Sequence, residues 1–188
     1  MVLIPPEGLH RGFAGLMNAY NGQRVGAGTV AMGIAAGAYE LALEFSTERN
    51  QFGRPICEFQ GLQWMLADMH IQIEAARLLL RKAAAGNSES SGENGNGFPD
   101  ILEAAQAKIF ASEMAIKVTN DALQIFGSSG YSRNFPLERM ARDARMFTIG
   151  GGTAQILRTV VASALLERKL PQTRDGDSKQ ENISQIDE

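Results

Sequence analysis

Apolar residues recur at steps of three and four along most of the chain, which is the spacing of one face of an α-helix. The first stretch with this pattern covers residues 9–47. Its apolar positions are Phe13, Leu16, Tyr20, Ala27, Val30, Ile34, Leu41 and Phe45. Small residues are frequent between Gly26 and Gly37 and lower the intrinsic helix propensity. We therefore predict a long helix that another helix, or a ligand, approaches closely.

A helix-breaking run, N-Q-F-G-R-P, follows the first helix and ends it at Gly53 and Pro55. The helical spacing then resumes and predicts a second long helix over about 58–85. Its single tryptophan, Trp64, is expected in the core or at a subunit interface. The segment GNSESSGENGNG at 86–97 has low complexity and predicts a flexible loop.

A third helix is predicted over 100–126, opened by the Pro-Asp pair before it and ended by Gly127. Shorter helices are predicted at 137–146 and 153–170, and no stretch has the alternating pattern of a strand. Long helices with short connections indicate an all-α fold, an antiparallel four-helix bundle.

Length and composition fit this single bundle. A chain of 188 residues, 44% hydrophobic and 21% charged, is typical of one globular domain with a substantial core. We expect that domain at 11–170. The polar segment 171–188 is predicted to be disordered.

Charge and cysteine content exclude several classes of protein. A net charge of −3, without a cluster of Lys and Arg, argues against a nucleic-acid partner. The chain has one cysteine, Cys57, and two distant histidines, His10 and His70, so we expect neither a disulfide nor a metal site. No leader sequence is evident, and charges interrupt the apolar stretches before they reach the roughly 20 residues of a membrane span. We therefore expect a cytoplasmic protein with no membrane partner.

Three runs carry candidate chemistry. They are TERNQFGRPICEFQGLQ at 47–63, DALQIFGSSGYSRNFPLERMARDAR at 121–145 and FTIGGGTAQILR at 147–158. In this order and spacing they resemble the motifs of the C-terminal helical domain of the acyl-CoA dehydrogenase family. The resemblance covers about 12–170. It implies that residues 1–10 lead in from a middle β domain that this chain lacks, and that the full-length protein forms a homotetramer.

The resemblance also implies FAD as cofactor and an acyl-CoA as substrate. A guanidinium, planar and permanently charged, suits the pyrophosphate of FAD. The residues that match flavin-contacting positions of the family are Arg49, Gln51, Phe52, Gln60, Gln124, Gly127, Ser128, Thr153 and Gln155. The first four would meet the FAD of a neighbouring subunit. On the first helix, Asn21 and Arg24 match positions that contact CoA.

The catalytic base of the family has no counterpart here. In most members a Glu precedes the Gly-Thr pair and removes the α-proton of the acyl-CoA, and the matching residue is Gly151. Other members carry that Glu on the first long helix, where this chain has Gln23. An amide cannot accept this proton at neutral pH. A positioned base is worth about 10²–10⁴ in rate, so we expect ordinary dehydrogenation to be crippled.

Gln23, Gly151 and their flanking segments closely resemble the 3-sulfinopropionyl-CoA desulfinase branch of the family, which lacks the catalytic Glu. That resemblance implies cleavage of a carbon–sulfur bond to give propionyl-CoA and sulfite. Two alternatives remain: a conventional FAD-dependent acyl-CoA dehydrogenase with its base elsewhere, and a catalytically inactive helical assembly module. The resemblance also implies that this segment alone would be inactive.

Overall fold

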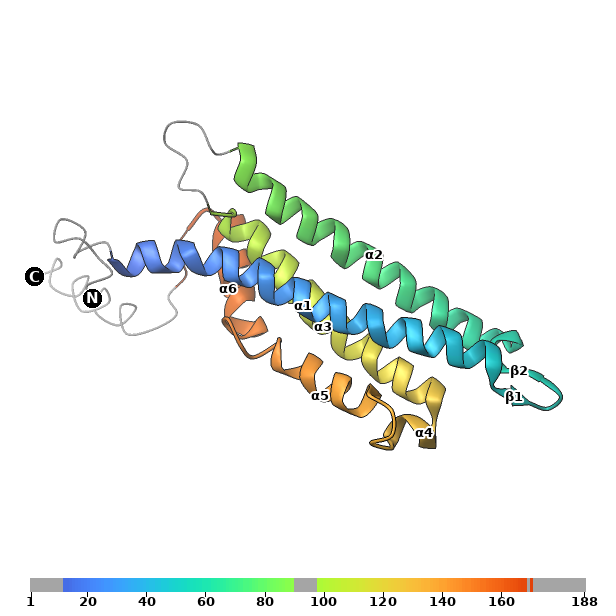
Figure 1. Ribbon diagram of the computed structural model, residues 1–188. Helices are drawn as coiled ribbons and strands as arrows, with labels where there is room; N and C mark the ends of the chain where they lie inside the picture. Colours follow the sequence, from blue (N-terminus) through green and yellow to red (C-terminus); the bar gives the residue numbers. More distant parts are fainter. Residues whose placement is uncertain (1–11, 90–97, 169, 171–188) are drawn as a thin grey trace, which may run out of the picture.

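The computed structural model describes residues 12–89, 98–168 and 170. Three long helices run alongside one another: α1 (Gly12–Glu48), α2 (Gln60–Glu89) and α3 (Ile101–Phe126). α2 is antiparallel to the other two, and the shorter α5 (Leu137–Met146) completes a bundle of four (Figure 1). The predicted all-α bundle is confirmed. The expected lead-in at 1–10, residues 90–97 of the expected loop and the tail at 171–188 lie outside the described residues.

Small residues on α1 explain how closely the helices pack. Ala31, Ala35, Ala38 and Ala42 recur on one face of α1 and are fully buried. A Cβ on Gly28 would lie only 2.8 Å from Cδ2 of Leu80 and 3.5 Å from the Cα of Lys108. A side chain at this position would therefore collide with Leu80 of α2, whereas its distance to α3 is that of ordinary van der Waals contact. The small residues of the first helix predicted close approach of either a helix or a ligand, and in the structure neighbouring helices pack against them.

α3 begins and ends as its sequence indicates. The Asp100 carboxylate accepts hydrogen bonds from the backbone N–H of Leu102 and Glu103, at 2.9 and 3.0 Å. These bonds satisfy two donors that a helix start leaves unpaired. At the other end Gly127 has a φ of +58°, a conformation that glycine adopts without a steric penalty. The four-residue α4 (Ser128–Tyr131) follows directly.

Three features differ from the sequence expectation, one of which is that the last helix ends at Leu165 rather than at residue 170. The turn between α1 and α2 contains a two-residue antiparallel hairpin, β1 (Asn50–Gln51) and β2 (Arg54–Pro55), before the short 3₁₀ helix η2 (Ile56–Glu58). Strands of two residues are too short to produce an alternating pattern. α2 also continues to Glu89, four residues into the segment expected as a loop.

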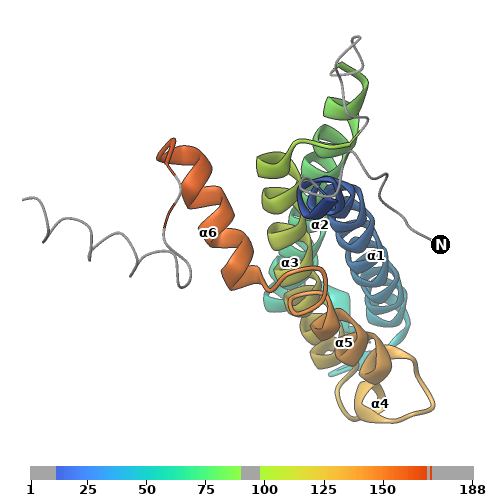
Figure 2. The same cartoon turned by 90° about the vertical axis from the view of Figure 1, so that its left-hand side faces the viewer.

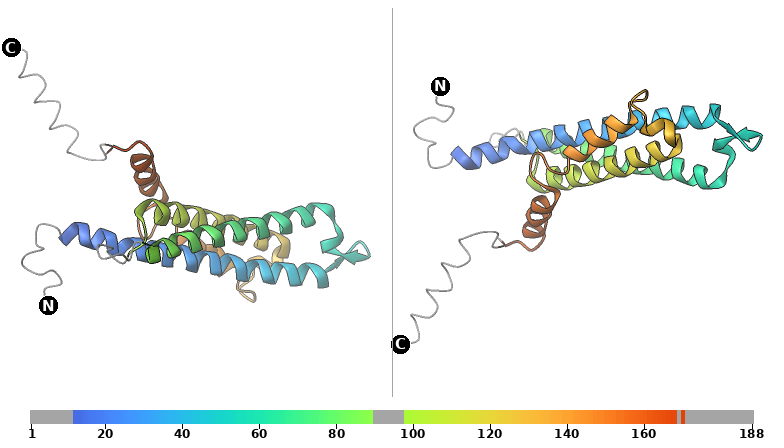
Figure 3. Two further views of the ribbon diagram at one scale, coloured as in Figure 1. Left: turned by 90° about the horizontal axis from the view of Figure 1, so that it is seen from above. Right: turned by 90° about the horizontal axis from the view of Figure 1, so that it is seen from below.

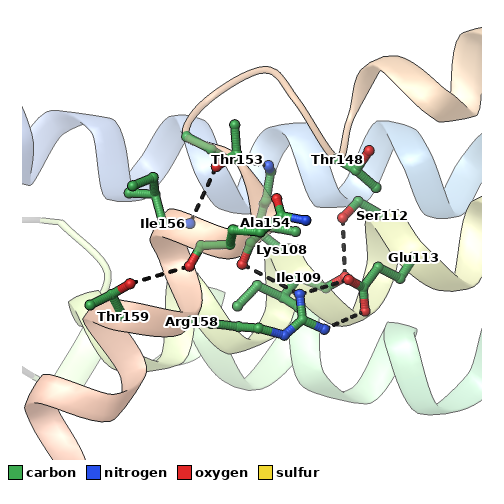
Figure 4. A network of polar contacts seen from close by, with 12 residues as sticks. Lys108, Ile109, Ser112, Glu113, Thr148, Thr153, Ala154, Ile156, Arg158 and Thr159 are labelled. Carbon is green, nitrogen blue, oxygen red and sulfur yellow. Dashed lines mark hydrogen bonds and ion pairs between the residues drawn. The ribbon is translucent and has the colours of Figure 1, made fainter.

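α6 (Ala154–Leu165) projects from the side of the bundle rather than lying along it (Figures 2 and 3). It is held near its start by the fully buried Leu157 and by an ion pair between Arg158 and Glu113 of α3, both of whose N···O contacts are 2.7 Å (Figure 4). Its orientation places the connection from α5 to α6 against α1 and α3. That connection forms one wall of the candidate site.

By length and mean hydropathy (1.2), residues 19–48 of α1 could also span a membrane. The helix is 33% buried over the relevant window, and its buried alanines face the rest of the bundle. This is the pattern of a helix that contributes to a protein core.

Candidate functional site

A pocket of about 460 Å³ lies between α1 and the connection that joins α5 to α6. Gln23, Gly26 and Ala27 line it from α1. From the other side it is lined by Met146, Phe147, Gly150 and Gly151. The two positions that match the catalytic base of the family, 23 and 151, thus share one pocket although 128 residues of sequence separate them. None of the residues that line it has a carboxylate.

The segment 150–152, which we call the glycine loop, has an unusual backbone. Gly151 has a φ of +72° and Gly152 a φ of +94°, values that residues with a Cβ rarely adopt. The N–H of Gly150 donates to the carbonyl of Met146 at 2.9 Å, which ties the loop to the end of α5. No acceptor among the described residues is found for the N–H of Gly151 or of Gly152. These donors are therefore available to a ligand.

Thr153 follows the glycine loop and starts α6. Its side-chain oxygen accepts a hydrogen bond from the N–H of Ile156 at 3.2 Å, as an N-cap residue does (Figure 4). The N–H of Ala154 donates to the carbonyl of Thr148 at 3.0 Å. The loop is thereby fixed at both ends, between the last turn of α5 and the first turn of α6.

Two buried cations lie behind the glycine loop. Arg24 of α1 is 8% exposed, and its Nε donates to the carbonyl of Gly151 over a long 3.5 Å. Lys108 of α3 is fully buried, and its Nζ donates to the carbonyl of Gly152 at 2.7 Å. Asn21, also buried, accepts a hydrogen bond at 2.7 Å from Arg24. Neither cation has a carboxylate partner within the described residues.

Burial lowers the pKa of both groups. Desolvation is the largest cause of the lowered pKa of Lys108, and the charge of Arg24 lowers it further. Desolvation alone lowers the pKa of Arg24. The two charges add, and no carboxylate among the described residues pairs with either, so the region behind the glycine loop is electropositive. An anionic ligand in the adjoining pocket would be stabilised.

The residues expected to bind FAD fall into two groups at opposite ends of the bundle. Thr153 and Gln155 lie beside the pocket. The others lie at the end of the bundle that carries the hairpin (Figure 1): Arg49, Gln51, Phe52, Gln60, Gln124, Gly127 and Ser128. At 1.5 Å per residue, roughly 37 Å of α1 separates Gln23 from Glu48.

The hairpin end presents groups suited to a ligand or a partner chain. Phe52 is 85% exposed and has a φ of +52°, which turns the chain at the tip of the hairpin. The guanidinium of Arg49 makes no hydrogen bond or ion pair with the described residues. Phe45 and Phe126 stack with ring centroids 4.0 Å apart, which joins the ends of α1 and α3 at this end of the bundle.

Sequence analysis missed Lys108. It is the largest fully buried side chain in the part of the chain that the structure describes. The signal was available: a lone lysine in the apolar run AAQAKIF of α3. On its own, however, that pattern is also typical of a lysine that extends its charged end into solvent.

The comparisons with known proteins identify the family of this chain. The family model described as "Acyl-CoA dehydrogenase, C-terminal domain" matches residues 10–166. The chain belongs to this family.

Two curated relatives are similar over almost the whole chain. The 3-sulfinopropanoyl-CoA desulfinase of Cupriavidus necator is 67% identical over 94% of this chain and 42% of its own length. That of Variovorax paradoxus is 68% identical over 95% of this chain and 43% of its own length. The chain thus spans less than half the length of these relatives.

A solved structure shares the fold. The butyryl-CoA dehydrogenase of Megasphaera elsdenii is 43% identical, with a TM-score of 0.75 over 83% of this chain and 39% of its own. The expected fold and family are confirmed, whereas the roles given to individual site residues stay predictions.

Proposed function

We propose that this chain is the FAD- and substrate-binding C-terminal domain of a 3-sulfinopropionyl-CoA desulfinase. The proposal combines the family membership with the similarity to curated desulfinases. The observation that carries it is the pocket itself, which has Gln23 and Gly151 at the two expected base positions, no carboxylate in its lining and two cations behind it.

The reaction needs no base to remove an α-proton. The carbon–sulfur bond of the sulfinate breaks, and a proton from water replaces sulfur on that carbon. The hydroxide left from the same water forms a bond to the sulfur, which leaves as hydrogen sulfite. One sulfinate and one water therefore give propionyl-CoA and hydrogen sulfite. Gln23 can donate a hydrogen bond from its amide to a sulfinate oxygen or to this water, whereas a Glu there would repel the anion.

The glycine loop supplies the other contact. Backbone N–H donors without protein acceptors can bind the carbonyl oxygen of a thioester and stabilise negative charge that develops on it. The N–H of Gly151 is such a donor. This N–H is present whether residue 151 is a glycine or a Glu, because it belongs to the backbone.

The residues expected to hold FAD fit that group chemically. An exposed guanidinium at Arg49 can pair with a pyrophosphate, and the exposed ring of Phe52 can lie against a flavin or adenine ring. In this branch of the family FAD is bound without net turnover. Gln51, Gln60, Gln124, Gly127 and Ser128 would complete the hairpin-end contacts.

The separation of the two groups favours a homotetramer. Because roughly 37 Å of helix lies between the pocket and the hairpin end, a second subunit would supply the hairpin-end contacts to the FAD beside Thr153 and Gln155. α2 also exposes Trp64, Ile71 and Leu78, which are 63%, 63% and 64% accessible and lie seven residues apart on one face. This apolar stripe suits burial against another subunit. We place the assembled enzyme in the cytoplasm.

A conventional dehydrogenase would need a carboxylate at the pocket. Glu40 is the nearest candidate on α1 after Gln23, and 17 residues of helix place it about 25 Å away. That distance is too long for Glu40 to replace a positioned base.

The test uses the full-length, FAD-loaded protein with 3-sulfinopropionyl-CoA and butyryl-CoA in parallel. We expect sulfite release without bleaching of the flavin, and no flavin reduction by butyryl-CoA. Reduction of the flavin by butyryl-CoA would contradict the proposal, because it requires a base. Absence of both reactions would favour a catalytically inactive assembly module.

A further inference from the structure

Lys108 is a buried cation that the proposed chemistry does not yet use. Its side chain is fully enclosed between α1, α3 and the glycine loop, and no carboxylate lies within 4.0 Å of its Nζ in the described chain. Burying an ammonium group without a counter-ion is unfavourable, and one carbonyl offsets this cost only in part. A methionine would fill similar space without this cost. The charge and the hydrogen bond are therefore the features that distinguish Lys108 from an apolar residue at this position.

The acceptor of Lys108 is the carbonyl of Gly152, at 2.7 Å (Figure 4 shows the start of α6 beside Lys108). The preceding carbonyl, that of Gly151, faces Arg24. Two successive carbonyls of the glycine loop are thus bound by cations from two different helices. Hydrogen bonds to charged donors are roughly twice as strong as those between neutral groups.

These two bonds matter because glycine is the most flexible residue. Without a Cβ, Gly151 and Gly152 can populate both signs of φ with little preference, so the loop alone does not select φ values of +72° and +94°. In a trans peptide the C=O and the N–H point in opposite directions, and the described chain has no cis peptide bond. The bonds from Arg24 and Lys108 therefore direct the N–H groups of Gly152 and Thr153 away from the helices. The peptide that carries the N–H of Gly151 lies between these held peptides and Gly150, whose own N–H is bound to Met146.

We propose that Lys108 is a positioning residue: by binding the carbonyl of Gly152 it fixes the peptide between Gly152 and Thr153, which restricts the conformation of the glycine loop to one in which the N–H of Gly151 remains free for the thioester carbonyl. This inference rests on the proposed function, because it assumes an acyl-CoA in the pocket. Lys108 itself touches neither substrate nor cofactor.

The experiment measures binding of two ligands to the full-length, FAD-loaded protein by calorimetry. Propionyl-CoA has the thioester carbonyl, and the thioether S-propyl-CoA lacks it. We expect the wild-type protein to prefer propionyl-CoA, and Lys108→Met to weaken propionyl-CoA binding about 10-fold, as for loss of one hydrogen bond of about 1.4 kcal/mol. Binding of S-propyl-CoA should not change.

The matched control is Lys117→Met on the same helix. Lys117 is exposed, pairs with Asp121 at 2.8 Å and lies away from the pocket, so this variant should bind both ligands as the wild type does. Lys108→Gln serves as a second variant if Lys108→Met does not fold. It keeps a donor on a shorter side chain, and it should also lose the preference for propionyl-CoA.

The outcomes separate the two proposals. If the wild type prefers propionyl-CoA and Lys108→Met keeps that preference, the positioning role is wrong while the proposed function stands. Equal loss of affinity for both ligands would also contradict the positioning role, since it indicates general support of the fold. If the wild type binds both ligands equally, Gly151 makes no contact with the carbonyl and the positioning role is wrong, whereas the proposed function fails only if sulfite release is absent.

Discussion

Placing a carboxylate at residue 151 should give the pocket the base that it lacks. The structure has room for the side chain, since a Cβ on Gly151 would have no atom within 4 Å. The cost comes from the backbone: at a φ of +72° a residue with a Cβ is strained by about 1–2 kcal/mol. This is a modest fraction of a typical unfolding free energy of about 5–15 kcal/mol. Gly151→Glu should therefore fold.

The expected gain is proton abstraction from the α-carbon of an acyl-CoA. A positioned general base contributes about 10²–10⁴ in rate, so the variant should reduce its bound FAD with butyryl-CoA at least about 100-fold faster than the wild type. The assay follows bleaching of the flavin absorbance under anaerobic conditions. Sulfite release should fall in the same variant, because the new carboxylate repels the sulfinate.

Gly151→Gln is the matched control, as it carries the same backbone strain in a side chain of nearly the same shape but cannot accept the proton. The reasoning would be refuted if Glu and Gln at residue 151 gave equal rates of flavin reduction. It would also be refuted by a loss of unfolding free energy above about 3 kcal/mol in the control. Such a loss would mean that the position is packed or more strained than its φ indicates.

Three further predictions concern stability. Gly130→Ala should destabilise the fold by about 2–3 kcal/mol, because its Cβ would lie 2.8 Å from the backbone oxygen of Leu123. Denaturant unfolding measures this change, and an unchanged midpoint would contradict it. Arg158→Ala should cost less than about 1 kcal/mol because its ion pair with Glu113 is partly exposed. The hydrogen bond from Arg158 lowers the pKa of Glu113, so this difference should be present above pH 4.5 and vanish as the pH falls through the lowered pKa. Burial lowers the pKa of Lys108 in the folded protein, so between that pKa and the ordinary value of 10.5 the unfolded chain binds more protons than the folded one. The stability of the wild type relative to Lys108→Met should therefore rise with pH across this window. A difference in thermal melts that stays flat or falls with pH would contradict this prediction.

The sequence predicts the helices because their periodicity and end signals are local. The helix predicted at 137–146 coincides with α5, and Asp100 and Gly127 bound α3 as expected. The hairpin between α1 and α2 was missed because it is only four paired residues long. The far end of α2 was misjudged because the low-complexity composition of its last residues does not by itself prevent a helix from continuing.

The absence of a base at Gln23 and Gly151 could be read from the sequence, because it depends on residue type at positions that the family motifs define. That these two residues face one pocket depends on the packing of α1 against the connection between α5 and α6, which only the tertiary structure decides. The same holds for Lys108, since whether a lysine on a helix reaches solvent or a buried carbonyl is fixed by its neighbours. Residue identity thus determined that the base is missing, and the packing of the helices decided which buried charges lie behind the pocket.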